Sequence, residues 1–179
     1  MSCDTGNLRK VILFKAIQKA HVSTWKNYQK TSSYREGARW NSAGVPVMYT
    51  SSNAQNAMLE IANYMPNPKT VNAVYDIAVF EFPELRLHSI EPNELPLEWH
   101  ETRHADGLKS LGDKYLTEPQ YDGIVVPSAT INRDIATHPI NALRQSVYAN
   151  VLVNLLTVGV SRIKLIDSFS PIYSANMFK

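Results

Sequence analysis

Short apolar runs broken by proline and glycine are the feature that most constrains the fold of this chain. Several of these runs are rich in β-branched and aromatic residues, as β-strands are. The expected strands are residues 10–15, 45–51, 71–82, 123–127 and 160–167. Only a few helical segments separate them, and they do not alternate strictly with the strands. The pattern therefore predicts an α+β fold with one mixed domain.

An amphipathic helix is expected after the second strand. Residues 51–53 (Ser, Ser, Asn) offer N-cap side chains, and residues 54–65 place apolar side chains on one face at helical spacing. Pro66 and Pro68 are expected to end this helix. The remaining expectations are loops at residues 26–37 and 91–101, a short helix at 107–116, and either helix or strand at 145–157.

Length and composition narrow the class of protein further. The 179 residues fit one domain, and the 18 basic and 16 acidic side chains give a net charge of +2, which excludes a strongly electrostatic nucleic-acid binder. The single cysteine, Cys3, excludes an internal disulfide framework and a Cys-rich metal site. No apolar run approaches the ~18 residues of a membrane span, and no secretion signal is evident. We therefore expect a soluble, cytoplasmic protein with no membrane partner and no direct nucleic-acid partner.

Charge is distributed unevenly along the chain. Residues 1–40 carry eight basic side chains against two acidic ones. This segment is either a solvated face or a basic wall that faces an anionic small molecule. The eight basic residues are Arg9, Lys10, Lys15, Lys19, Lys26, Lys30, Arg35 and Arg39.

One segment matches the H-E-x-x-H pattern of zinc metalloproteases. His100 and His104 would share one helix face and bind Zn²⁺, with Glu101 as the general base. Two prolines lie just upstream, no apolar stripe supports a buried helix, and Ser110 stands where an extended pattern has a third histidine. An exposed loop is therefore favoured, and a zinc hydrolase remains a remote alternative.

A second group of candidate residues surrounds the expected strand at 45–51. Arg39 follows a glycine-containing turn and can present a bidentate guanidinium to a phosphate. Tyr49 lies near the end of the strand, and Ser51 precedes a helix whose N-terminus favours anions. Glu60 lies opposite the apolar stripe of that helix. The alternative makes Glu60 a solvated helix residue and Trp40 a packing residue.

A third candidate is Ser128, which follows the expected strand at 123–127. A hydroxyl at a strand end is a common ligand contact. The segment has no G-x-S-x-G elbow, so nothing marks Ser128 as a nucleophile. The alternative is a turn or cap residue.

Taken in chain order, these segments resemble the RES domain family, which is named for its Arg, Glu and Ser. The resemblance spans about residues 10–170, and it implies a single domain with a central, mainly antiparallel sheet similar to that of ADP-ribosyltransferases. The matching stretches are G-A-R-W-N (37–41), G-V-P-V-M-Y-T-S (44–51), M-L-E (58–60), L-G-D-K-Y-L (111–116), I-V-V-P-S-A (124–129), N-V-L-V-N (150–154) and S-R-I-K-L-I-D (161–167).

The resemblance also implies a function. Members of the family are toxins of toxin–antitoxin pairs that degrade NAD⁺, some by phosphorolysis, while at least one kind modifies a protein. NAD⁺ would be a consumed substrate, and phosphate or water would accept the ADP-ribose, with no cofactor and no metal. A cognate antitoxin or immunity protein is the implied partner. The implied catalytic residues are Arg39, Glu60 and Ser128, and the implied substrate-binding residues are Lys15, Asn41, Tyr49 and Ser51.

Three departures from the family pattern indicate a divergent member. Lys15 stands where the family commonly has an arginine, which keeps the charge but loses the bidentate fork. Residues 131–149 are expected to be an insertion, and the family's N-P-x-H-P is degraded at 154–158. Two alternatives stay open: an ADP-ribosyltransferase that modifies a protein, and a RES-like binding module with weakened catalysis.

Overall fold

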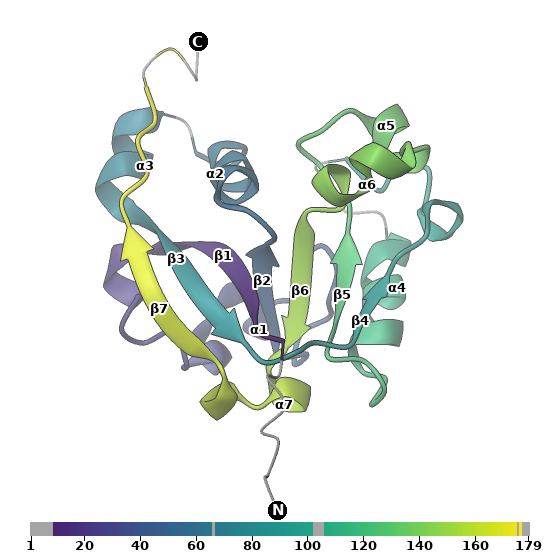
Figure 1. Cartoon of the computed structure of the whole chain (residues 1–179), viewed down its shortest axis with the longest axis horizontal. Coiled ribbons are helices and arrows are strands. Elements are labelled where there is room, and N and C mark those ends of the chain that lie inside the picture. Colours follow the sequence, from purple (N-terminus) through teal and green to yellow (C-terminus); the bar gives the residue numbers. More distant parts are fainter. Residues whose placement is uncertain (1–8, 66, 102–105, 175, 177–179) are drawn as a thin grey trace, which may run out of the picture.

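The computed structural model describes residues 9–65, 67–101, 106–174 and 176. Within them the chain forms a seven-stranded sheet in the order β4-β5-β6-β2-β1-β3-β7, with helices around it (Figure 1). The β4–β5 pair is parallel and the other neighbouring pairs are antiparallel. The expected α+β domain with a mainly antiparallel central sheet is confirmed.

The elements have the following bounds. The strands are β1 (Val11–Gln18), β2 (Val47–Ser51), β3 (Tyr75–Phe82), β4 (Leu87–Ser89), β5 (Gly123–Val126), β6 (Asn150–Asn154) and β7 (Lys164–Phe169). The α-helices are α1 (Ser32–Arg35), α2 (Ala54–Ala62), α3 (Pro68–Val74), α4 (Asp106–Leu116), α5 (Arg133–Thr137), α6 (Asn141–Val147) and α7 (Leu155–Val158). Short 3₁₀ helices lie at Lys19–His21, Tyr28–Lys30, Pro92–Glu94 and Val160–Arg162.

The expected strand at residues 71–82 is wrong in its first part. Helix α3 occupies this part, and the strand begins only at Tyr75. The Asn67 side chain caps the helix by accepting a hydrogen bond from the Thr70 N–H at 2.9 Å. Pro68 lies in the first turn, where its missing N–H is not needed. Pro68 therefore lies at the start of helix α3, and it also follows the end of helix α2.

Other differences are smaller. Helix α2 ends at Ala62, short of the expected 65, and the expected loops contain α1 and three-residue 3₁₀ turns. Strand β4 was not expected, and the ambiguous segment 145–157 holds the end of α6, then β6, then the start of α7. Residues 131–149, the expected insertion, contain α5 and α6.

The sheet has an apolar core on each face. Side chains alternate across the pleat, so that Val47 and Leu152 join one cluster while Met48 and Val153 join the other. The first cluster packs under α4 and includes Trp40, Trp99, Leu108 and Leu116. The second is built on β1, β3 and β6 and includes Leu13, Ile17, Phe80 and Phe82. The site described below depends on strands held between these two cores.

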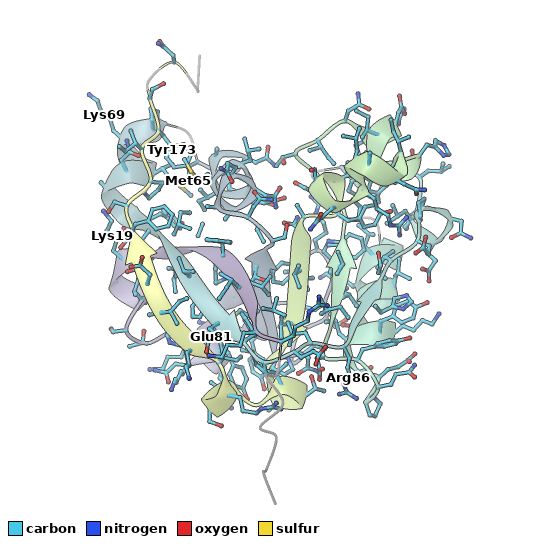
Figure 2. The ribbon with its side chains drawn as sticks, viewed as in Figure 1. Lys19, Met65, Lys69, Glu81, Arg86 and Tyr173 are labelled. Atoms are coloured by element: carbon cyan, nitrogen blue, oxygen red, sulfur yellow. The ribbon has the colours of Figure 1, made fainter. Side chains whose placement is uncertain are left out.

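Two ion pairs join residues in or next to the strands at one end of the sheet. Figure 2 labels Glu81 and Arg86, which lie toward the lower end of the sheet in that view. Lys10 Nζ lies 3.0 Å from the Glu81 carboxylate, and Arg86 Nη2 lies 2.8 Å from Asp122 Oδ1. The Arg86 guanidinium holds the pKa of the Asp122 carboxyl below its usual value.

None of the helices formed by the described residues has the length and apolar character to cross a membrane.

Candidate active site

Glu60 is the centre of a polar cluster formed by three elements. It lies on α2, Ser128 follows β5, and Asn150 begins β6. The Ser128 hydroxyl donates a hydrogen bond to Glu60 Oε1 at 2.6 Å, and Asn150 Nδ2 donates to the same oxygen at 2.8 Å. Glu60 is half-buried and Ser128 is fully buried. The alternative in which Glu60 is a solvated helix residue is therefore wrong.

The strand register explains why these side chains meet. Asn150 stands opposite Ser51 of β2 on one side and opposite Val126 of β5 on the other. Ser128 follows Val126 by two residues, so it leaves the sheet beside the Asn150 end of β6. Helix α2 begins directly after β2 and places Asn56 and Glu60 one turn apart on the same face.

Further hydrogen bonds fix the members of this cluster. Asn56 Nδ2 donates to Asn150 Oδ1 at 2.7 Å and to Ser51 Oγ at 3.0 Å. Ser51 Oγ lies 3.4 Å from Asn150 Oδ1, and the Ser128 and Thr130 hydroxyls are 2.7 Å apart. Buried polar groups are stable in a protein interior when they are paired in this way.

Three members of the cluster, Ser51, Glu60 and Asn150, line a cavity of about 640 Å³. This volume is within the range of about 300–1,000 Å³ that is typical of small-molecule sites. Of the predicted site residues, Lys15, Tyr49, Ser51 and Glu60 line the cavity, together with Asn150. Aromatic side chains supply much of the remaining wall: Trp25, Tyr28, Tyr64 and Tyr75.

Lys15 supplies positive charge to the cavity. Its Nζ donates a hydrogen bond to the Tyr49 carbonyl at 3.1 Å, and burial lowers the pKa of the ammonium to about 8. Lys30 also lines the cavity, while Lys10 and Lys19 form ion pairs with acidic side chains of β3. Of the eight basic residues of the predicted basic wall, Lys15 and Lys30 are the two among the described residues that line the cavity.

Tyr49 and Asn41 hold the loop before β2. The Tyr49 hydroxyl donates to Asn41 Oδ1 at 2.7 Å and accepts from the Trp40 N–H at 3.1 Å. Burial raises the pKa of this hydroxyl above its ordinary value. Asn41 is fully buried, does not line the cavity, and donates from Nδ2 to the carbonyls of Ser33 and Ser42. Tyr49 therefore lines the cavity, while its hydroxyl and the Asn41 amide have structural partners.

Arg39 is not among the residues that line the cavity. Its Nη1 donates to the carbonyls of Trp99 at 2.8 Å and Glu101 at 2.9 Å. These two hydrogen bonds hold residues 99–101 against the turn that contains Arg39. The structure brings Lys15, Ser51 and Glu60 together on one cavity and leaves Arg39 and Asn41 apart from it. Ser128 is fully buried and reaches the cavity only through its hydrogen bond to Glu60. Contact of Arg39 and Asn41 with a substrate stays a prediction.

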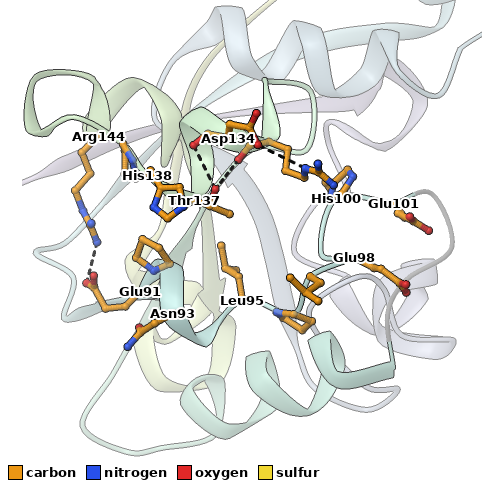
Figure 3. A pocket seen from close by; sticks show the side chains of 15 residues that line it. Glu91, Asn93, Leu95, Glu98, His100, Glu101, Asp134, Thr137, His138 and Arg144 are labelled. Atoms are coloured by element: carbon orange, nitrogen blue, oxygen red, sulfur yellow. Dashed lines mark hydrogen bonds and ion pairs between the residues drawn. The ribbon is translucent and has the colours of Figure 1, made fainter.

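A larger, more open hollow of about 1,120 Å³ lies elsewhere, between the segment 91–101 and helices α5 and α6 (Figure 3). It contains His100 and Glu101 of the zinc-protease pattern, while His104 lies outside the described residues. Among the residues that the structure describes, no three His, Cys, Asp or Glu side chains gather as metal ligands would. This hollow contains none of the residues that the RES resemblance implies, so the smaller cavity is the candidate site.

Sequence reasoning missed Asn56, Thr130 and Asn150 as members of the site. Asn150 is a polar residue at the start of an apolar run, and Asn56 lies four residues before Glu60 on the predicted helix. A polar stripe on a helix that also has an apolar stripe was the available signal for Asn56. Asn150 begins the family stretch N-V-L-V-N, but its contact with Glu60 spans 90 positions of the chain, so the sequence does not show that the two side chains meet.

Comparison with known proteins identifies a family and a similar fold. The model of the RES domain matches residues 12–148. A chain in the crystal structure of the M. tuberculosis MbcT–MbcA toxin–antitoxin complex has a similar fold, with a TM-score of 0.64 and 14% sequence identity. The similarity covers 96% of this chain and 88% of that one. No curated protein matches the sequence.

Proposed function

Because the chain belongs to the RES domain family, we propose that it is a toxin that consumes NAD⁺. The proposed reaction cleaves the bond between nicotinamide and ribose and transfers ADP-ribose to phosphate or water. The similar fold of a chain from a toxin–antitoxin complex supports the role as a toxin, and it supports a cognate antitoxin or immunity protein as partner.

The observation that carries this proposal is the Glu60 carboxylate on the cavity wall, held by Ser128 and Asn150. Loss of nicotinamide from the ribose passes through a state with oxocarbenium character, as glycoside cleavage does. A carboxylate fixed in advance beside the ribose stabilises that developing positive charge and can accept hydrogen bonds from ribose hydroxyls. Ser128 serves as a donor to Glu60 in this scheme and not as a nucleophile.

The remaining cavity residues suit the rest of the substrate. Lys15 and Lys30 offer positive charge to the pyrophosphate, and Lys15 does so as a point charge where the family commonly has a planar fork. The rings of Trp25 and Tyr28 offer apolar faces to the planar bases of NAD⁺.

Incubation of the purified protein with NAD⁺ tests the proposal. We expect release of nicotinamide, with a phosphorylated ADP-ribose as product when phosphate is present and ADP-ribose when it is absent, as resolved by mass spectrometry. A third arm with labelled NAD⁺ and a cell lysate detects transfer to protein. NAD⁺ that survives in all three arms would contradict the enzymatic role and favour the weakened binding module.

Lys15 makes a pH dependence predictable. Burial lowers the pKa of its ammonium to about 8, so the positive charge is present below that pH and is lost as the pH rises through it. We therefore expect the KM for NAD⁺ to rise between about pH 7.5 and pH 9. Lys15→Arg should abolish this rise, because arginine stays protonated throughout the range. Lys15→Glu should raise KM at every pH, because a carboxylate would face the pyrophosphate.

The control for this series is Lys10→Arg, which alters a lysine of the same segment that is paired with Glu81 and lies outside the cavity lining. It should leave the KM profile of the wild type intact. A wild-type KM that stays constant from about pH 7.5 to pH 9 would place the Lys15 ammonium away from the bound phosphates.

A further inference from the structure

Two hydrogen-bond donors converge on a single oxygen of Glu60. Ser128 Oγ and Asn150 Nδ2 both donate to Oε1, at 2.6 and 2.8 Å. Within the part of the chain that the structure describes, no hydrogen bond to Oε2 is formed, and Glu60 lines the cavity. The two oxygens of this carboxylate therefore differ: Oε1 is fixed by protein donors, and Oε2 is free for a ligand.

We propose that Asn150 is a positioning residue, which acts with Ser128 to fix the Glu60 carboxylate so that Oε2 faces the reacting ribose. The inference rests on the proposed function, since it assigns a role within that reaction. Asn150 does not itself touch the substrate in this scheme. It acts through Glu60.

The orientation of the Asn150 amide is determined by its other partners. Asn56 Nδ2 donates to Asn150 Oδ1 at 2.7 Å, which leaves the Asn150 NH₂ group turned toward Glu60. The reverse orientation would place two NH₂ groups face to face and two oxygen acceptors face to face. Asn56 is buried and lies one helical turn before Glu60, so helix α2 supplies both the carboxylate and the group that orients its partner.

Loss of the Asn150 donor should therefore affect the reaction step more than substrate binding. Glu60 would keep the Ser128 hydrogen bond but could rotate about it, and misplacement by about 1 Å lowers a rate by about 100-fold. An interaction that matters mainly in the transition state lowers kcat and leaves KM little changed.

The test is Asn150→Asp in the full chain, with NAD⁺ as substrate. The variant keeps an acceptor for Asn56 but places a carboxylate oxygen against Glu60. We expect kcat to fall about 100-fold near pH 8, with KM changed less than about threefold. Activity should recover toward about pH 5, because a proton shared between the two carboxyl groups restores a donor. Recovery of kcat at acid pH, measured on protein that is folded at both pH values, is a readout that a merely structural role would not give.

The matched control is Asn154→Asp, at the other end of the same strand. Asn154 is also buried, but its side chain donates to the Leu116 carbonyl and caps α7. This variant should be destabilised at neutral pH, but kcat measured on the folded protein should stay near the wild-type value at every pH. A crystal structure of Asn150→Ala adds a readout independent of turnover, and we expect the Glu60 carboxylate to occupy more than one rotamer there.

The outcomes separate the two proposals. Wild-type protein that leaves NAD⁺ intact contradicts the proposed function, whereas a single Glu60 rotamer in Asn150→Ala contradicts the positioning role. The positioning role is also overturned by an Asn150→Asp variant that keeps the wild-type kcat from about pH 5 to pH 8, or by equal acid recovery in Asn154→Asp.

Discussion

Replacement of Glu60 by glutamine is expected to lower kcat for NAD⁺ cleavage by about a thousandfold, or about 4 kcal/mol of transition-state stabilisation. Glutamine has the same shape, and its carbonyl oxygen can still accept the hydrogen bonds from Ser128 and Asn150. The negative charge that faces the developing oxocarbenium is lost. Single-turnover release of nicotinamide measures the effect, and urea unfolding confirms that the variant folds.

A second carboxylate provides the control for Glu60. Glu98→Gln changes an exposed glutamate that lines the larger hollow (Figure 3), and it should leave turnover at the wild-type rate. Loss of activity in Glu98→Gln together with full activity in Glu60→Gln would show that the reaction takes place in the larger hollow.

The double variant Ser128→Ala, Glu60→Gln should be scarcely slower than Glu60→Gln alone, because Ser128 acts through the carboxylate.

The sequence predicts those strands of the sheet that coincide with an apolar, β-branched run of residues. Strands β1, β2, β5 and β7 lie within a few residues of the apolar runs that predict them. Residues 71–74 contain valines that suit a strand or a buried helix face, and the local cap at Asn67 decided in favour of the helix. Strand β4 is formed by parallel pairing with β5, a tertiary contact that three residues of sequence do not encode.

For the candidate site, the sequence points to Glu60 and Ser128 but not to the residues that surround them. Glu60 and Ser128 were found through the family pattern, and the register of β5 and β6 then adds Asn150 beside them. The same pattern also marks Arg39 and Asn41, whose side chains bond to backbone carbonyls in this structure. A motif thus identifies residues that belong together, but whether each one touches the ligand or holds a loop depends on partners far away in the chain.

The family stretch L-G-D-K-Y-L (111–116) also contains residues that hold a loop. One of them, Gly112, gives the largest expected effect on stability. Gly112 lies in the interior of α4, where a Cβ atom would be 1.9 Å from the Trp40 carbonyl oxygen. Asp113 Oδ1 accepts the Ser42 N–H at 3.0 Å, so α4 touches the 40–42 loop at two consecutive residues. Because backbone atoms would have to move, we expect Gly112→Ala to lower the free energy of unfolding by about 3 kcal/mol.

Urea unfolding at constant m-value measures this loss, which corresponds to a fall in Tm of about 6 to 12 °C. Gly107→Ala is the matched control on the same helix, since its Cβ would meet only Pro96 Cγ at 3.6 Å, an ordinary contact. That variant should be stabilised by about 0.5 kcal/mol, because alanine loses less backbone entropy in a helix. Equal stability of the two variants would show that α4 can move away from Trp40. The loop that Tyr49 and Asn41 hold would then not depend on the close approach at Gly112.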